Sequence, residues 1–367
     1  MYLKIISIYN INRMATMANT ITLKETYFNI DAIDFFLSID TENPNYDKEL
    51  MMWPTEQMKL QELKNNIVNN SQTIEYKIKK YGVGRLYPSP YNTYQSMYNI
   101  IRRIVINGNL SSVDVVNAHP TFMVQLCERY ADGYEPELLN MYVQDRDAMR
   151  TKIMTECNIS KSQVKQLTLT MMFGGFYQKW FKDNNLPLPD CVFLKRFHEE
   201  LDVIFTRIPP KFYPNYQKFN DIGILKRGDD VKAQQRTAIA LYLQDTERQV
   251  IQHLIEYAQI NNIEVVSLIH DEILITNTSK IDLSEAEKYI NDNTGFAIKL
   301  ESKETTPTPE DFEWVDIHKP FVKKTTINEV RDAVMKLDKK RTVGYNECMR
   351  VIFSIKGATN NSDEAEI

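Results

Sequence analysis

Three polar residues interrupt the apolar stretch VVSLIHDEILIT at residues 265–276. The flanking β-branched runs predict two short buried strands, with His270, Asp271 and Glu272 at the turn between them. A further acid, Asp114, comes near the end of another predicted strand, SSVDVV. Carboxylates at the ends of neighbouring strands can hold Mg²⁺ ions, which prefer oxygen ligands and share them with substrate phosphates. Each aspartate taken alone is more often a turn or cap residue.

A helix with a lysine-rich start is predicted over residues 160–173, SKSQVKQLTLTMMF. Ser160 and Gln163 have the spacing of a capping box. Lys161 and Lys165 then fall in the first two turns, where free backbone N–H groups already favour an anion. Phe173 closes the helix before two glycines. Such a helix is suited to a polyanion, and the alternative is a surface helix with two solvated lysines.

Two long stretches of the chain contain no acid. Residues 77–110 carry six basic residues interleaved with five tyrosines, and residues 161–182 carry four lysines. Basic and aromatic side chains together suit phosphate neutralisation and base stacking. Either stretch alone would fit a solvated charged face, but two of them in a chain of net charge -5 favour a polyanionic partner.

The composition is that of an ordinary soluble globular protein, with 43% hydrophobic and 25% charged residues among 367. No apolar run approaches the ~18 residues that a membrane-spanning helix needs, and no signal peptide is recognised, so we expect no membrane contact. We expect an intracellular protein that is not secreted, in the cytoplasm, a viral factory or an organelle of a host. The scattered cysteines favour reduced, buried thiols, and the histidines share no helix face, which argues against zinc: Cys127, Cys157, Cys191 and Cys348.

The order of elements predicts an α+β fold, with a β-rich sheet packed by helices on one side and interrupted by a helical insert. Residues 1–76 are predicted to be mostly helical, 77–304 to form the core, 305–312 a linker, and 313–367 a separate piece. Within the core, IRRIVI (101–106) and SSVDVV are predicted as paired strands, after a Gly- and Pro-rich loop at 82–92. Helices are predicted over 137–182, 231–261 and 284–293, and a strand over 296–302.

These segments together resemble the motifs of family A DNA polymerases and phage-type single-subunit RNA polymerases. The helix with Lys161, Lys165, Phe173 and Gly174 is similar to the Arg-x3-Lys-x7-Tyr-Gly helix that grips the incoming nucleoside triphosphate. The HDE triplet at 270–272 is identical to the third motif of the family.

Three other motifs occur in family order over residues 81–314. The segment GRL at 84–86 resembles the primer-side loop, with Arg85 as its arginine, and Asp114 matches the first metal aspartate. Arg236 and Gln244 keep the Arg-x7-Gln spacing of the helix that reads the minor groove of primer–template DNA. The resemblance implies a polymerase palm with a helical fingers insert, a reduced N-terminal thumb-like region and a small helical C-terminal extension.

The implied activity is template-directed nucleotidyl transfer with two Mg²⁺ ions, or Mn²⁺ in their place, on Asp114 and Asp271. Lys165 would neutralise α- and β-phosphate charge and assist pyrophosphate departure, and Lys161 would hold the γ-phosphate. Phe173 would stack on the new base pair. Glu272 would support the second metal aspartate, Asp271, without binding metal directly. The implied DNA contacts are Arg85, Arg236, Gln244 and His270.

This chain departs from the family at three positions. Lys161 replaces an arginine, which removes bidentate phosphate geometry, and Phe173 replaces a tyrosine. His119 stands where family DNA polymerases keep a glutamate that excludes a ribose 2′-OH, so selection of the sugar is open. The segment NAHP after Asp114 is similar to the transposon-and-virus branch of this superfamily, including virophage proteins. Members are proposed primase-polymerases that are often joined to a superfamily 3 helicase, and residues 346–367 resemble the start of the connecting domain.

Several alternatives stay open from the sequence. The chain could be a single-subunit DNA-directed RNA polymerase or a pure primase, which differ from a DNA polymerase in nucleotide preference. A two-aspartate nuclease would share the metal chemistry but has no use for the lysine-rich helix. A non-catalytic replication scaffold could retain the fold. The expected partners are primed or single-stranded DNA template, nucleoside triphosphates and a superfamily 3 helicase.

Overall fold

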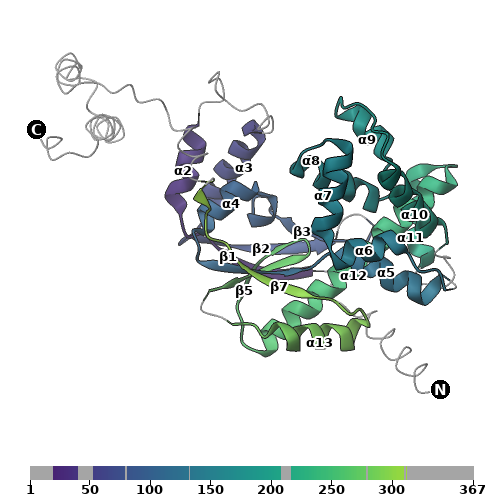
Figure 1. The fold of residues 1–367 in the computed structure, drawn as a ribbon. Helices are drawn as coiled ribbons and strands as arrows, with labels where there is room; N and C mark the ends of the chain where they lie inside the picture. Colours follow the sequence, from purple (N-terminus) through teal and green to yellow (C-terminus); the bar gives the residue numbers. More distant parts are fainter. Residues whose placement is uncertain are drawn as a thin grey trace, which may run out of the picture. The chain divides into compact units, whose positions relative to one another are not determined.

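The computed structural model describes residues 20–39, 53–78, 81–131, 133–207, 216–277, 280–309 and 311 (Figure 1). By contacts the chain divides into two units, Met1–Leu37 with Pro54–Pro307 and Ser38–Trp53 with Thr308–Ile367. The elements below belong to the first unit, apart from the last residue of α2 and the first of α3. The predicted C-terminal piece, residues 313–367, lies outside the described residues, as do residues 1–19, Lys79, Lys80 and Cys348.

Two antiparallel sheets organise the first unit. One has the strand order β1–β2–β3 and the other β5–β6–β4–β7. Their bounds are β1 Thr20–Thr26, β2 Ser71–Ile78, β3 Leu86–Ser89, β4 Leu110–Val115, β5 Val265–Ile269, β6 Glu272–Thr276 and β7 Leu300–Glu304.

Helices account for most of the remaining described residues. They are α2 Ile30–Ser38, α3 Trp53–Asn66, η2 Tyr94–Ser96 (a 3-10 turn), α4 Asn99–Ile106, α5 Ala118–Tyr130, α6 Glu137–Gln144, α7 Arg146–Cys157, α8 Lys161–Met172, α9 Tyr177–Asp183, α10 Val192–Arg207, α11 Tyr216–Arg227, α12 Val231–Ile260 and α13 Leu283–Thr294. In Figure 1, α6–α11 gather beside the strands, whereas α12 and α13 pack under the second sheet. The predicted α+β class is confirmed.

Several local predictions are confirmed by the elements observed. The stretch 265–276 forms the hairpin β5–β6, whose strands are almost wholly buried. Ser160 and Gln163 form the predicted capping box at the start of α8, and Phe173 is its C-cap. The predicted helices over 137–182 and 231–261 appear as α6–α9 and α12. Local capping and apolar periodicity therefore decide these elements.

Two local predictions are wrong. The segment IRRIVI was expected to be a strand, but it lies in α4, where Ile101, Ile104 and Val105 are buried at helical spacing. The predicted loop at 82–92 contains β3, which pairs with β2. In both cases β-branched or turn-forming residues misled the prediction because packing outweighs local propensity. Residues 1–76 were expected to be mostly helical, and their described part contains the helices α2 and α3 together with the paired strands β1 and β2.

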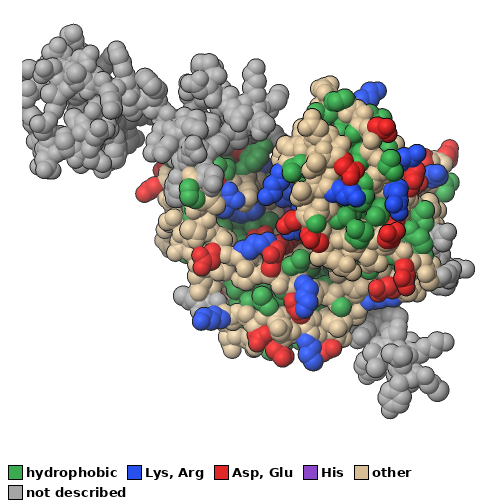
Figure 2. Space-filling model, viewed as in Figure 1, with side chains coloured by type: hydrophobic (Ala, Val, Ile, Leu, Met, Phe, Trp, Pro, Cys, Tyr) green, Lys and Arg blue, Asp and Glu red, His purple; other side chains and the backbone are tan. Residues whose placement is uncertain are grey.

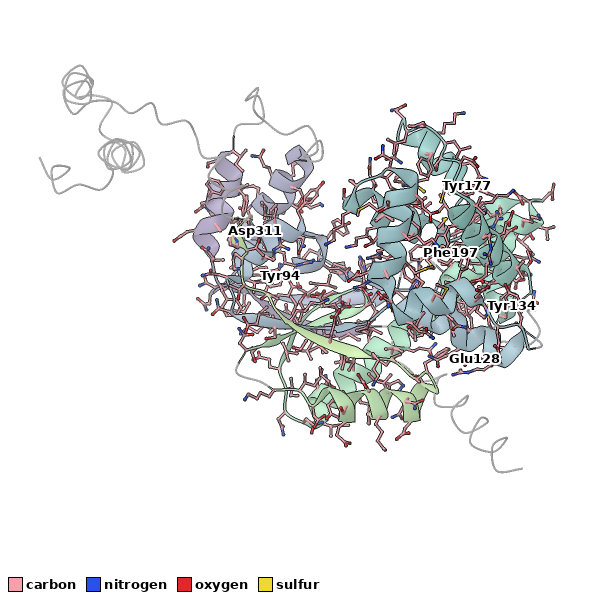
Figure 3. The ribbon with its side chains drawn as sticks, viewed as in Figure 1. Tyr94, Glu128, Tyr134, Tyr177, Phe197 and Asp311 are labelled. Atoms are coloured by element: carbon pink, nitrogen blue, oxygen red, sulfur yellow. The ribbon has the colours of Figure 1, made fainter. Side chains whose placement is uncertain are left out.

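A buried carboxylate connects the two sheets. Glu25 of β1 is fully buried, and one of its oxygens accepts hydrogen bonds from the Tyr76 hydroxyl on β2 and the Ser267 hydroxyl on β5, each at 2.6 Å. The other oxygen accepts from the Tyr27 hydroxyl and from the backbone N–H of Tyr94, which Figure 3 labels beside the strands. Burial raises the pKa of Glu25, and these donors oppose that rise. The carboxylate therefore joins both sheets through four donors.

We expect Tyr76→Phe to lower the free energy of unfolding by about 1–3 kcal/mol, because it removes one donor from a buried carboxylate. Tyr91→Phe is the matched control, since Tyr91 is 56% exposed. Urea denaturation of both variants measures the difference. Equal stability of the two would show that the Tyr76 hydroxyl does not hold the sheets together.

No helix within the described part of the chain is both long and apolar enough to cross a membrane. Cys127, Cys157 and Cys191 are buried free thiols, as predicted.

Candidate active site

The second sheet brings Asp114 and Asp271 to the same end. Asp114 is the next-to-last residue of β4 and pairs with Glu272 on β6, directly after the hairpin tip. The Val115 N–H donates a hydrogen bond to the Asp271 carbonyl across 3.1 Å, which fixes the tip beside the end of β4. His270 takes a left-handed backbone conformation, φ +57°, so that the chain reverses within this short turn. The two aspartates, called the acid pair below, come from positions 157 residues apart (271 − 114).

The acid pair is electrostatically strained. Burial, followed by repulsion from Glu247 and Asp114, raises the pKa of Asp271 to about 7, and Arg85 opposes this rise. Burial likewise raises the pKa of Asp114, whereas Lys303 lowers it through a contact of 3.3 Å between its Nζ and Oδ2 of Asp114. A cation that binds between two buried carboxylates relieves their mutual repulsion and is therefore bound favourably.

A buried glutamate that the sequence analysis did not select lies beside the acid pair. Glu247, in the middle of α12, is 1% exposed and accepts two hydrogen bonds from Arg85, at 2.5 and 2.7 Å. Its Oε2 is also 2.7 Å from Nε2 of His119. The two atoms are close but are not aligned as a hydrogen bond. Burial would raise the pKa of Glu247, but His119 and Arg85 hold it at about 2. We call Glu247, Arg85 and His119 the Glu247 cluster.

The end of α8 meets the same cluster. The Phe173 ring lies edge-on to the His119 ring, with 4.9 Å between centroids and an interplanar angle of 76°. The Arg85 guanidinium lies 6.0 Å from the centroid of Phe173. His119 belongs to the first turn of α5, directly after β4. The structure therefore gathers Arg85, His119 and Phe173 from three distant segments around Glu247.

The loop before β3 is held against α12 by a second buried acid. Asp245 accepts a hydrogen bond from the Gly84 N–H at 3.0 Å and a further one from Arg248. Gly84 has φ +91°, which favours glycine, and a Cβ there would lie 3.5 Å from Oε1 of Gln244. Because Gly84 is held against α12, Arg85 lies close to Gln244, and both residues were predicted to contact DNA.

Lys161 and Lys165 are exposed on α8, one turn apart. Within the described residues neither forms an ion pair with an acid, and neither contacts the acid pair. Phe173 lies about 12 Å along the helix axis from Lys165, at 1.5 Å per residue. Both ammonium groups are available to a polyanion, and the C-terminal end of the same helix reaches the Glu247 cluster.

Arg236 is engaged differently from the other predicted DNA contacts. Its guanidinium forms an ion pair with Asp202 of α10 and lies 4.3 Å from the ring centroid of Phe176. Its stem fills the space beside Gly174, which has φ +79°. The structure thus places Arg236 as a link between α12 and α10, and contact with DNA would require the Asp202 pair to open.

We expect Gly174→Ala to destabilise the protein by about 1–3 kcal/mol more than Gly295→Ala. Both glycines have positive φ, but an added Cβ at Gly174 would lie 2.8 Å from Cβ of Arg236, whereas at Gly295 it meets nothing within 4 Å. Thermal unfolding of the two variants isolates the close approach of α8 and α12. Equal melting temperatures would contradict this packing.

Two basic side chains of the acid-free stretch 77–110 are paired with acids of the same chain. Arg85 is paired with Glu247, and Lys77 with Glu75. Tyr94 is fully buried, so it cannot stack on a base, whereas Tyr91 is 56% exposed. The stretch is therefore not the continuous phosphate-binding face that its composition indicates.

On the face shown in Figure 2, basic and acidic side chains gather in a recess beside α7 and α8.

The turn residues that flank Asp271 are also partly buried. Burial, followed by repulsion from Arg85, lowers the pKa of His270 to about 4, so this imidazole is neutral at pH 7. Burial raises the pKa of Glu272, and Arg102 opposes it. Glu272 lies directly across from Asp114 in the β4–β6 pairing.

The carboxylates at this site supply only some of the ligands that a magnesium ion needs. No group of three or more His, Cys, Asp or Glu side chains arranged to hold a metal occurs in the described ranges. Glu247 is occupied by Arg85 and His119, so the other carboxylates near the turn are those of the acid pair and Glu272. Mg²⁺ commonly takes one or two carboxylates together with waters and substrate phosphates, so the acid pair suffices when a triphosphate is bound.

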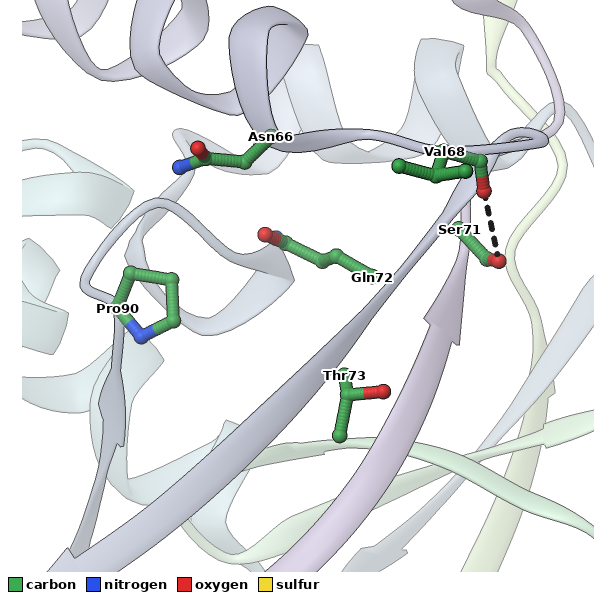
Figure 4. A pocket seen from close by; sticks show the side chains of 6 residues that line it. All are labelled: Asn66, Val68, Ser71, Gln72, Thr73 and Pro90. Atoms are coloured by element: carbon green, nitrogen blue, oxygen red, sulfur yellow. Dashed lines mark hydrogen bonds between the residues drawn. The ribbon is translucent and has the colours of Figure 1, made fainter.

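A pocket elsewhere in the unit carries none of this chemistry. It lies over β2 and is lined by neutral side chains: Asn66, Val68, Ser71, Gln72, Thr73 and Pro90 (Figure 4). The Ser71 hydroxyl donates to the Val68 carbonyl at 3.2 Å, as drawn there. None of these residues belongs to the acid pair or the Glu247 cluster.

Glu247 and Asp245 could have been suspected from one signal. Six polar residues, Gln244 to Gln249, separate the apolar segments AIALYL and VI of α12, and the structure buries the middle four, Asp245 to Arg248. Charged residues are rarely buried unless they are paired. Their partners Gly84, Arg85 and His119 are more than 120 residues away, so the signal could not have named them.

No protein-family profile matches the chain. Over 250 residues the chain is 27% identical to "Putative helicase V13" of Sputnik virophage, covering 65% of this chain and 31% of that protein. The chain thus spans about a third of the length of that relative. The solved structure of the POL domain of Pol1 from M. smegmatis, in complex with DNA primer-template and dNTP, is 12% identical. It covers 75% of this chain and 54% of that one at a TM-score of 0.43, which supports no statement on function.

Proposed function

We propose that this chain is a template-directed nucleotidyltransferase, a DNA-directed DNA polymerase with primase activity that replicates a virus or mobile element. The observation that carries the proposal is the convergence of the acid pair, Arg85, His119 and Phe173 at one end of the second sheet. These residues come from five segments, and each holds a place in the polymerase motifs that the sequence resembles. The similarity to a virophage protein supports the viral setting.

In this proposal the sheet β5–β6–β4–β7 is the palm and α6–α11 are the fingers. The N-terminal residues 1–76 would act as a reduced thumb, and residues 313–367 would connect to a helicase of superfamily 3. The name of the virophage relative, a helicase, makes such a partner reasonable. Primed or single-stranded DNA and nucleoside triphosphates are the proposed substrates.

The acid pair would hold two Mg²⁺ ions, or Mn²⁺, which when bound supply charge neutralisation for the triphosphate and activation of the primer 3′-hydroxyl. Lys165 would neutralise the α- and β-phosphates and donate a proton to the leaving pyrophosphate, and Lys161 would hold the γ-phosphate. Phe173 would stack on the new base pair. Glu272, the residue after Asp271, would support that carboxylate without binding metal.

The remaining predicted residues would orient the nucleic acid. Arg85 and Gln244 lie together where Gly84 approaches α12, so they would contact the same part of the primer–template duplex. His270 at the hairpin tip would lie under the primer terminus. Arg236 would join them only if it left Asp202.

A primer-extension assay tests this function. The protein is incubated with a primed template, an unprimed template, dNTPs or NTPs, and Mg²⁺ or Mn²⁺. Extension of the primer with dNTPs supports a DNA polymerase, and products on the unprimed template support primase activity. Extension with NTPs alone would favour the RNA polymerase alternative, and DNA binding without any extension would favour the scaffold.

A further inference from the structure

The position that selects the sugar in the polymerases this chain resembles is here occupied by His119, with an acid from another helix beside it. A histidine side chain can adopt several rotamers, so its ring keeps one orientation only when neighbouring residues fix it. Glu247 supplies such a neighbour from α12, at 2.7 Å from Nε2 of His119. The Phe173 ring supplies another, edge-on at 4.9 Å. Glu247 lies in the middle of α12 and Phe173 caps the end of α8, so both neighbours are held by helices.

We propose that Glu247 is a positioning residue for sugar selection, holding the His119 imidazole against Phe173 so that it meets the ribose edge of the incoming nucleotide. This inference rests on the proposed function and deepens it. It assigns the discrimination between deoxyribonucleotides and ribonucleotides to the His119–Glu247 pair. In the polymerases that this chain resembles, a single glutamate at the position of His119 has this role.

The geometry of Glu247 suits this role. Both of its oxygens accept from Arg85, and its side chain is 1% exposed, so the carboxylate cannot rotate without breaking two charge-assisted hydrogen bonds. His119 is 7% exposed and lies between this fixed carboxylate and the ring of Phe173. A ring held on two sides has one orientation to offer a substrate.

The contact between Glu247 and His119 also leaves the imidazole with hydrogen-bonding capacity. Nε2 of His119 makes no aligned hydrogen bond among the described residues, although Oε2 of Glu247 is 2.7 Å away. Glu247 therefore restricts the ring through this close approach, and the buried Nε2 keeps an unmet hydrogen-bonding capacity. Loss of the Glu247 carboxylate would free the ring to turn, and the ribose edge would lose its fixed boundary.

A double-mutant cycle separates this role from a general structural one. Incorporation of dATP and of ATP opposite template dT is measured under single-turnover conditions for the parent, Glu247→Gln, His119→Ala and the double variant. The readout is the ratio of kcat/KM for dATP over ATP. We expect Glu247→Gln to lower this ratio by roughly tenfold in the parent and by less than about twofold when His119 is already alanine. An equal effect in both backgrounds, or none in the parent, overturns the inference.

A second variant keeps the test decisive if Glu247→Gln does not fold. His119→Phe retains a ring of similar size beside Phe173 but removes the contact with Glu247, which stays bonded to Arg85. We expect its dATP-to-ATP ratio to fall by a similar factor. An unchanged ratio would mean that the bulk of the ring suffices, and that Glu247 serves only Arg85.

Equilibrium binding keeps the failure of this inference distinct from the failure of the proposed function. Binding of dATP and of ATP is measured on primed DNA that ends in a dideoxynucleotide, so no chemistry is needed. A parent that extends no primer overturns the polymerase proposal. The double-mutant cycle can still be evaluated from the binding constants, which give the coupling energy between Glu247 and His119. Absence of any preference for the sugar in the parent, or of coupling between the two residues, overturns the role of Glu247.

Discussion

Asp114→Asn and Asp271→Asn are each expected to reduce nucleotide addition by roughly 10³-fold or more, because each removes a charged ligand from the proposed pair of metal ions. Binding of primed DNA should change little, since the acid pair serves the chemistry and contributes no attraction for phosphates. Rates are measured by rapid-quench primer extension, and DNA binding by fluorescence anisotropy.

The same substitutions are expected to leave the fold intact, and Asp271→Asn should not lower the melting temperature. The Asp271 carboxylate is buried near Glu247 and Asp114, and both raise its pKa, so its charge opposes folding in the metal-free protein. Glu304→Gln, at the exposed end of β7, is the matched control and should extend at the parental rate. Either aspartate variant extending within tenfold of the parent would remove the acid pair from the mechanism.

Lys165→Ala is expected to slow nucleotide addition by about 10²-fold or more, because it removes both charge stabilisation and a proton donor for the leaving pyrophosphate. Lys161→Ala should instead raise the KM for the nucleotide with a smaller effect on kcat, since a contact to the γ-phosphate contributes to binding in the ground state as well. Both lysines are exposed and have no acidic partner among the described residues, so neither substitution should disturb the fold.

Lys195→Ala provides the control for loss of a positive charge from the helical part, because Lys195 is 66% exposed on α10. Steady-state extension with varied dNTP measures kcat and KM for all three variants. If Lys161→Ala and Lys165→Ala changed DNA affinity alone, α8 would be a surface for duplex binding, and the proposed grip on the triphosphate would be wrong.

Much of the local structure around the candidate site follows from the sequence by itself. The apolar runs on either side of His270, Asp271 and Glu272 specify the hairpin, because strands of this composition are stable only when buried and a polar tip must then turn. The capping box of Ser160 and Gln163 specifies the start of α8. Such signals lie within a few residues of one another, so no knowledge of the fold is needed to use them.

Other elements depended on contacts that no short window contains. The β-branched residues of α4 favour a strand locally, but burial of Ile101, Ile104 and Val105 on one helical face outweighs that preference. Glu25 shows the same limit, since a carboxylate in β1 is stable at full burial only because Tyr76 and Ser267 donate to it from two different sheets.

The sequence by itself determined which residues could perform the chemistry, namely the acid pair and the lysines of α8. Only the tertiary structure decided what surrounds them. It placed Glu247 against Arg85, 162 residues away, and against His119, and it engaged Arg236 with Asp202. The physical reason is that a charge buried in a helix is tolerated only with partners, and partners from distant segments meet only when the whole unit folds.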